Sequence, residues 1–246
     1  MMKRLAYLLL ALPLIPACSS NDNSGDDTNT SSTDQDVTAR AVGQSASQQG
    51  GDASAMASVT AIAQGQTPLG FTLSGDGSFQ GSTLGIDYDF SLTCKDASGN
   101  TQVACDATTD SADASVDWSG SLSVGTLSTS IDRSGDWSIS GLQGDTATFD
   151  GSGSLAFDMS ASNAAYHFND SADYNGVLVD TSSHTSVGGS ITYTIDATKT
   201  VDGNDSSFSM TADVDFSADG SAMITIDGST QYTLDVATGA VVKVND

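Results

Sequence analysis

From residue 69 to the end of the chain, apolar and polar residues alternate one by one in a series of short runs. The first clear run is Ile86–Cys94, where every second residue is apolar and the residues between are Asp, Ser or Thr. A period of two predicts β-strands with one apolar and one polar face. Similar alternation recurs in runs around Phe157, Tyr193, Met210, Ile224, Leu234 and Val242.

Short glycine-containing turn signals stand between these runs. They include Ser98-Gly99-Asn100, Asp202-Gly203-Asn204, Asp219-Gly220, Asp227-Gly228 and Thr238-Gly239. Short turns between successive two-faced strands make those strands antiparallel neighbours, so the pattern predicts a meander of about ten to twelve strands.

A sheet with one polar face must bury its apolar face by curling or by packing on another layer. A closed barrel, a curved half-barrel covered by an N-terminal helix and a two-sheet sandwich all meet this demand. We therefore expect residues 69–246 to form an all-β domain, an antiparallel meander that makes a curved sheet or barrel-like body.

Residues 37–68 have a different pattern. Met56, Val59, Ile62 and Ala63 recur at helical spacing behind Asp52, a possible N-cap, which predicts one short helix. The weaker segment before Gly50-Gly51 is either a second helix or part of the tether that precedes it. We interpret the whole range as a helical or irregular lead-in to the β domain.

The composition supports the β assignment and restricts the function. All 31 acidic residues are Asp and none is Glu, and the chain has 25 Gly. Aspartate and glycine favour turns over helices. With only seven basic residues the formal net charge is −24, a field that repels nucleic acid and anionic lipid headgroups. We expect no nucleic-acid partner and no peripheral binding to anionic membranes.

The first eighteen residues have the layout of a secretory signal. Lys3 and Arg4 form a basic head, and Leu5–Leu14 is apolar apart from one tyrosine. This apolar run is too short to cross a bilayer. Ile15–Cys18 then places an aliphatic residue, a small residue and a cysteine where the bacterial lipobox has them. The start of the chain therefore resembles that of a bacterial lipoprotein precursor.

That resemblance covers only the signal, and it implies that residues 1–17 are removed and that Cys18 carries acyl chains such as palmitate. Two or more chains would make a durable membrane anchor. Ser19 stands where enterobacterial lipoproteins retained at the inner membrane have aspartate, so the resemblance implies an outer-membrane lipoprotein, periplasmic or surface-exposed. The alternative is an ordinary signal peptide with an incidental cysteine.

Residues 18–36 would comprise the lipidated cysteine and a flexible tether. From Ser19 to Asp36 the chain has no large apolar residue, so it cannot bury enough surface to order itself.

The remaining cysteines, Cys94 and Cys105, predict a disulfide, because the chain is expected to be exported. The turn-forming residues between them suggest that the two cysteines face each other across a hairpin. A metal-binding or redox-active thiol pair is the rival interpretation. It is less favoured because the spacing is not CxxC, and a closed four-ligand zinc site would need both histidines of the chain.

Candidate chemistry is sparse. His167 and His184 fit solvated surface positions, and no GxSxG or HExxH motif occurs. Asp215, Ser217 and Asp219 match the first half of a calcium-binding EF-hand loop, but Ile226 stands at the twelfth position, so a hairpin turn explains them better. We therefore expect no cofactor, with calcium as the one open possibility, and we interpret Trp118 and Trp137 as core residues.

Together these features predict a non-enzymatic, lipid-anchored cell-envelope protein with a binding or structural role. Its partners would be the membrane, through the lipid, and an envelope protein or a glycan. Two alternatives remain open. A curved half-barrel could carry lipid or acyl chains, or a pair of aspartates could serve a hydrolase on a β scaffold.

Overall fold

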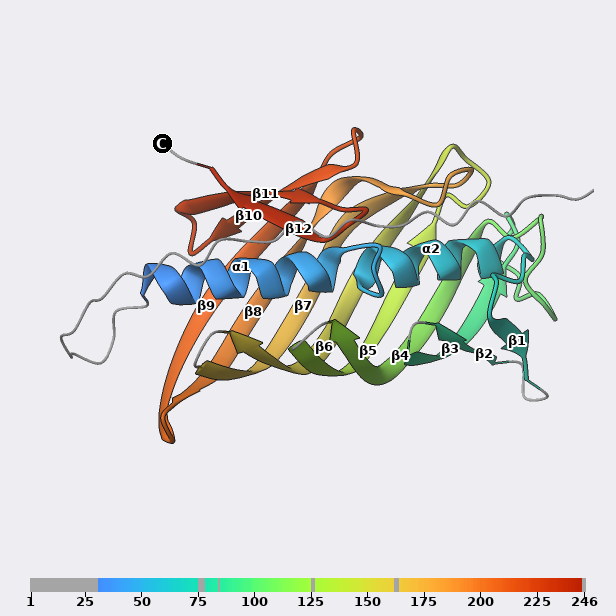
Figure 1. The fold of residues 1–246 in the computed structure, drawn as a ribbon. Helices are drawn as coiled ribbons and strands as arrows, with labels where there is room; N and C mark the ends of the chain where they lie inside the picture. The colour runs from blue at the N-terminus through green and yellow to red at the C-terminus, as the bar shows by residue number, and fades with distance from the viewer. Residues whose placement is uncertain (1–30, 75–77, 84, 125–126, 162–163, 245–246) are drawn as a thin grey trace, which may run out of the picture.

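In the computed structural model, an open antiparallel sheet wraps around two helices (Figure 1). The structure describes residues 31–74, 78–83, 85–124, 127–161 and 164–244. Twelve strands follow one another in chain order across the sheet, and each pairs with the next. This confirms the predicted meander. The sheet is curved but not closed, because β1 and β12 do not pair among the described residues.

The strands are longest in the middle of the sheet and short at both edges, which gives the sheet a broad centre. Their bounds are β1 Phe71–Leu73, β2 Phe79–Thr83, β3 Ile86–Lys95, β4 Ser111–Val124, β5 Leu127–Ser140, β6 Thr146–Ala161, β7 Ala164–Asp180, β8 Ser186–Val201, β9 Asn204–Phe216, β10 Ser221–Ile226, β11 Thr230–Asp235 and β12 Ala240–Lys243.

The two faces of the sheet differ as the alternation predicts. Along β7 the side chains from Ala164 to Asn175 are buried and exposed in strict turn. The buried face is concave and rich in aromatic residues, and both tryptophans, Trp118 and Trp137, are 2% exposed within it. Their interpretation as core residues is confirmed.

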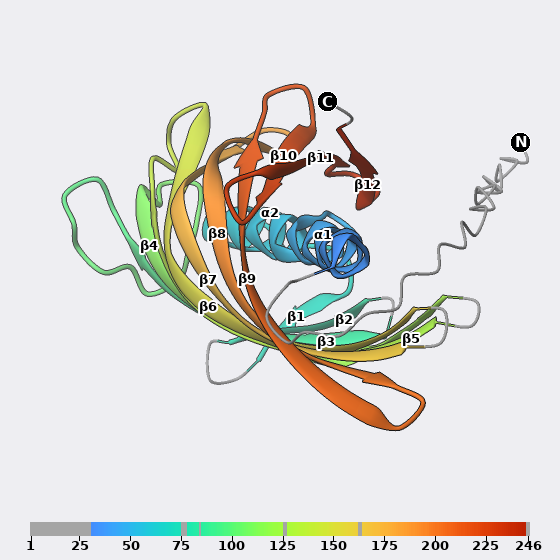
Figure 2. The same ribbon diagram turned by 90° about the vertical axis from the view of Figure 1, so that its left-hand side faces the viewer.

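Two helices fill the concave face. α1 spans Ser32–Ala46 and α2 spans Asp52–Ala63. They lie nearly end to end and cross the strands, so the end-on view shows one helical rod inside the curl of the sheet (Figure 2). α1 contacts β9 to β12, whereas α2 contacts β3, β4 and β7. The helix-covered half-barrel among our alternatives is therefore the observed architecture.

The joint between the helices is tight. Gly51 is the N-cap of α2, and a Cβ added there would lie 2.3 Å from the carbonyl oxygen of Ser45. Its φ of −93° suits any residue, so the close approach of the two backbones, and not the dihedral angle, requires glycine here.

The helical region differs from the prediction in extent. Both segments on either side of Gly50-Gly51 are helical, and α1 begins at Ser32, inside the range 18–36 that we expected to be tether. Ser31 caps it, since its Oγ accepts a hydrogen bond from the amide of Asp34 at 3.2 Å. Asp52 is not an N-cap but the first helical residue of α2. The buried residues of α1 are mostly small, among them Ala39, Ala41 and Gly43, so the sheet can pack closely against this helix although its apolar pattern is weak.

Cys94 and Cys105 form the predicted disulfide. The two cysteines do not sit directly opposite each other, which corrects our expectation for this hairpin. The backbone carbonyl of Cys94 instead accepts a hydrogen bond from the amide of Gln102, and the chain continues through a loop before Cys105 reaches back.

The predicted signal, Cys18 and the tether up to residue 30 lie outside the described residues. Within the part of the chain that the structure describes, no helix has the length and apolar character needed to cross a membrane.

Replacement of Gly51 by alanine tests the helix joint. The new methyl group would collide with the backbone at Ser45, and alanine is also a poor N-cap, so we expect Gly51→Ala to lower the free energy of unfolding by about 2 kcal/mol. Urea denaturation measures this. Gly144→Ala is the matched control, because there the nearest atom to the new Cβ is 3.3 Å away. Equal stability of the two variants would contradict the tight joint.

Candidate functional site

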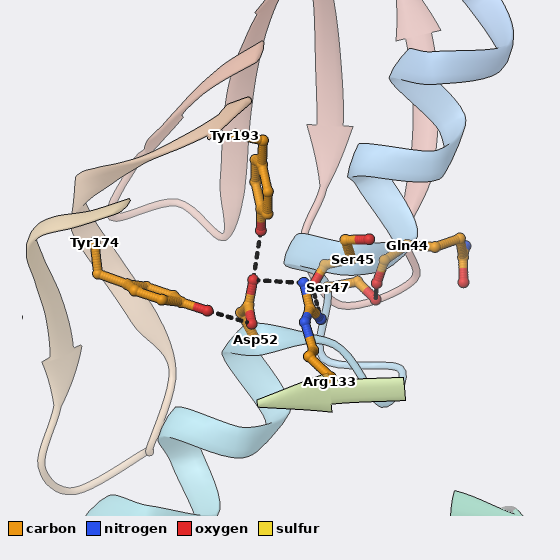
Figure 3. Close-up of polar contacts among 7 residues, drawn as sticks. All are labelled: Gln44, Ser45, Ser47, Asp52, Arg133, Tyr174 and Tyr193. Atoms are coloured by element: carbon orange, nitrogen blue, oxygen red, sulfur yellow. Dashed lines mark hydrogen bonds and ion pairs between the residues drawn. The ribbon is translucent and has the colours of Figure 1, made fainter. Parts of the chain in front are cut away.

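A buried ion pair lies under the joint between the two helices (Figure 3). Arg133, on the concave face of β5, places Nη2 2.9 Å from Oδ2 of Asp52, at the start of α2. The exposed fractions of the two side chains are 3% and 0%. Arg133 also donates from Nη1 to the carbonyl oxygen of Ser45, at the end of α1. One arginine therefore joins the sheet to both helices.

Two tyrosines complete the ring of donors around Asp52. Tyr174 of β7 donates to Oδ1 at 2.8 Å, and Tyr193 of β8 donates to Oδ2. Burial raises the pKa of Asp52, and the charge of Arg133 opposes that shift. Burial and the neighbouring carboxylate also keep the pKa of both tyrosines well above its ordinary value, so both hydroxyls remain donors.

We call the centre formed by Arg133, Asp52, Tyr174 and Tyr193 the clamp, because it holds both helices against the sheet. Both oxygens of Asp52 already accept hydrogen bonds, and the guanidinium of Arg133 lies over the ring of Trp118, 5.1 Å from its centroid. The ion pair is desolvated, and the atoms of Asp52 and Arg133 that form it also make the hydrogen bonds described above. The arrangement therefore fixes the helices, and neither group is free to act as a base or nucleophile.

A second polar contact holds the beginning of α1. The Nζ of Lys199 in β8 lies 2.7 Å from Oδ1 of Asp34, and Tyr166 of β7 donates to the same oxygen at 3.2 Å. Burial alone would raise the pKa of Asp34, but hydrogen bonds from Lys199 and Ser31 bring it below its ordinary value. Asp34 was expected in the tether, and it instead fastens α1 to the sheet.

Asp170 is a buried carboxyl without such partners. It lies on the concave face of β7 and is 6% exposed, and among the described groups its Oδ1 has no hydrogen-bond partner. In the sheet register Leu155 stands between it and Arg133. Burial raises the pKa of Asp170 to about 7, although the positive charge of Arg133 counteracts the shift.

The convex face carries carboxylates and hydroxyls. A trough of about 550 Å³ is lined by Asp87, Asp89, Asp117 and Asp132 from β3, β4 and β5. Asp89 and Asp117 are directly opposite each other in the register. Such a surface can accept hydrogen bonds from hydroxyls and ammonium groups. Among the described residues, no group of three or more His, Cys, Asp or Glu side chains is arranged to hold a metal ion.

The calcium candidates form a hairpin turn. Asp215 lies in β9, and Ser217 and Asp219 lie in the turn to β10. The Asp219 carboxylate accepts hydrogen bonds from the amide and hydroxyl of Ser221, at 3.0 and 2.6 Å. Its oxygen thus serves the turn itself.

The two histidines lie apart from each other. His167 is half exposed on β7, with Nδ1 2.7 Å from Oδ1 of Asp158. His184 lies in the loop between β7 and β8, where its Nε2 is 3.1 Å from Oε1 of Gln64. Neither contacts the buried centre through any described hydrogen bond.

Sequence reasoning missed Arg133 and Asp170, although the alternation contains a signal for both. Arg133 occupies an inward position of β5 between Ile131 and Trp137, and Asp170 an inward position of β7 between Phe168 and Ala172. A charged residue at an apolar position of a two-residue period marks a buried charge that needs a partner.

Comparison of the chain with protein-family models, with curated proteins and with solved structures finds no match.

A double-mutant cycle tests the clamp. Arg133→Met and Asp52→Asn each leave a buried group without its partner, so we expect each to lower the free energy of unfolding by about 3 kcal/mol or more. Because the second replacement removes a partner already lost, the double variant should cost at least about 2 kcal/mol less than the sum. Urea denaturation provides the values. Additive losses would show that the pair is uncoupled.

The exposed pair Lys95 and Asp113 provides the control cycle, since its side chains are 35% and 55% exposed. We expect Lys95→Met and Asp113→Asn to change stability by less than about 1 kcal/mol each.

Asp170 predicts a dependence of stability on pH. Between its ordinary pKa of 3.8 and the folded value of about 7, the folded state holds a proton that the unfolded state has released. The free energy of unfolding therefore falls as the pH rises through this window, by up to about 1.4 kcal/mol per pH unit. Asp170→Asn should remove this contribution and be the more stable protein at pH 8.

Urea denaturation at pH 5 and pH 8 measures the effect of Asp170. Asp117→Asn, on the exposed face, removes the same formal charge and should keep the pH dependence of the wild type. Parallel curves for Asp170→Asn and the wild type would contradict a buried titrating carboxyl.

Proposed function

We propose that this protein is a lipid-anchored, non-enzymatic component of the bacterial cell envelope, with a binding or structural role at the outer membrane. The basic head, the apolar run and Cys18 support the anchor, and the acidic, disulfide-bonded domain suits an extracytoplasmic compartment.

The observation that carries the binding or structural role is the occupied concave face. α1 and α2 fill it and are fastened there by Asp34 and Asp52, which contact Lys199 and Arg133 respectively. The surfaces left for a partner are the convex face and the edges of the sheet, which are rich in Asp, Ser and Thr.

Two features favour a non-enzymatic protein. The buried ionised groups of the clamp have their hydrogen bonds satisfied. On the convex face the Asp158 carboxylate contacts both Ser130 and His167, but no described hydrogen bond joins that hydroxyl to the imidazole.

The hydrolase alternative would need two aspartates that converge on a substrate. Asp52 and Asp170 are buried, whereas Asp89 and Asp117, opposite each other in the convex trough, are the described pair that this alternative would use.

A lipid carrier is the less favoured alternative. An acyl chain could enter the aromatic concave face only after α1 and α2 had left it, which would break the ion pair of Arg133 and expose two uncompensated charges. A structural or binding role requires no such rearrangement.

The anchor can be tested in a bacterial host that processes lipoproteins. With radiolabelled palmitate, we expect the wild type to be labelled and to sediment with the outer membrane. The Cys18→Ser variant should take up no label and leave the membrane fraction, because it lacks the thiol that receives the acyl chain. Cys105→Ser, which removes a different cysteine, is the control and should still be labelled.

Membrane sedimentation of unlabelled Cys18→Ser protein would contradict the lipid anchor. Organic extraction of the same purified variant tests the carrier alternative, since a stoichiometric, noncovalently bound lipid in the extract would support a carrier over the role proposed here.

A further inference from the structure

One long strand of the sheet is paired along only part of its length. β9 pairs with β8 from Asn204 to Asp215, but on its other side it pairs with β10 only from Ala212 to Phe216. The first half of β9 therefore has no neighbouring strand on that side among the described residues. Figure 2 shows this end of β8 and β9 projecting beyond the rest of the sheet. We name residues 204–210 the free edge.

The backbone groups that the free edge exposes can be identified. The amide of Thr211 donates to Oδ1 of Asp227 and its carbonyl accepts from the amide of Asp227, both at 2.9 Å. Both groups of Thr211 therefore point away from β8. Because successive residues of a strand point their backbone groups to opposite sides, those of Asp205, Ser207 and Ser209 also point outward.

The turn after β10 explains why the pairing stops there. Asp227 and Gly228 have positive φ values of 48° and 64°, and with Ser229 they form the three-residue connection to β11. The chain turns back at this point, so β10 covers β9 no further than Ala212. The free edge is therefore a consequence of how β10 and β11 are connected.

The side chains of the free edge form two different surfaces. On the concave side Met210 is buried and Phe208 is partly buried, 6.5 Å from the ring of Tyr166. On the convex side Asp205 and Ser209 are exposed. A strand added here would meet apolar groups with one set of its side chains and a carboxylate with the other.

We propose that the free edge of β9 binds an extended segment of a partner protein as an additional strand, with lysine or arginine facing Asp205 and apolar residues facing Phe208. The unpaired amides and carbonyls supply the backbone hydrogen bonds, and the alternate side chains supply the selectivity.

The negative charge of this protein favours a basic segment as the binding partner. The chain carries a net charge of −24, and its described cations near the edge are already paired, as Lys199 is with Asp34. A second copy would bring the same charge to a contact of only seven residues, where repulsion would outweigh the short pairing. A basic partner gains from the same field.

This inference rests on the proposed binding role and gives it a location, but it is independent of the anchor. The probe is the capped peptide Lys-Val-Lys-Phe-Lys-Val-Lys, titrated by fluorescence anisotropy against the purified full chain. Ser207→Pro removes one outward amide without touching the pairing with β8, and a proline is tolerated at such a position of an edge strand. We expect it to weaken peptide binding by about tenfold or more.

Two controls separate edge pairing from nonspecific attraction to an acidic protein. Ser207→Ala keeps the amide and should bind like the wild type. A peptide of the same sequence with N-methyl groups on alternate residues keeps its charge but loses donors, and the wild type should bind it about tenfold more weakly. Thermal melting confirms that each variant is folded, and the methylated peptide tests the proposal even without the proline variant.

Equal binding by the wild type and Ser207→Pro, or of both peptides, would overturn the proposal. So would sedimentation of the wild type as a dimer that Ser207→Pro dissociates, since the occupant would then be a second copy. Neither outcome would alter the labelling of Cys18, so failure of this inference and failure of the anchor can be told apart.

Discussion

The ion pair between Arg133 and Asp52 is the interaction on which the arrangement of this protein depends. It lies where the two helices meet, and its two side chains are almost completely buried. A charge in that position is tolerated only when its partner is present. The pair therefore ties the sheet to the helix joint, and the concave face is occupied as long as it holds.

α1 is held by polar contacts as well as by apolar packing. Apart from Val37 and Val42 it buries small residues together with Asp34, and its polar contacts to the sheet recur along its length. Polar contacts have defined directions, so they fix which turn of the helix meets which strand. The aromatic residues of the sheet supply the apolar surface. Asp170, whose Oδ1 has no described hydrogen-bond partner, is an inward carboxyl whose burial lowers stability at neutral pH.

With its interior filled, the protein can meet other molecules only through its outside. The convex face repeats cross-strand contacts between aspartate and a hydroxyl, as at Thr192 and Asp213 or at Ser130 and Asp158. These contacts help to order a densely acidic face, on which Lys95 and His167 each contact one further aspartate oxygen. The free edge of β9 is the part of this outside where backbone groups are also available, so a partner can be held there by directional bonds as well as by charge.

The sequence by itself determined the sheet. A period of two, the glycine turns and the pair Cys94 and Cys105 act between residues close in the chain, so the meander, its two faces and the disulfide could be predicted from local patterns. The boundary of α1 was wrong, because Ser32 to Asp36 has no apolar pattern of its own and is ordered by contacts such as Asp34 with Lys199.

Only the tertiary structure decided where the helices lie and what the charged residues do. Arg133 and Asp52 are 81 residues apart in the chain, and their pairing exists only after the sheet has curled around the helices. The alternation predicts that Arg133 and Asp170 point inward. It does not predict that Arg133 has an ion-pair partner or that Oδ1 of Asp170 has no described hydrogen-bond partner. That depends on which atoms share a buried volume, and local periodicity carries no information about it.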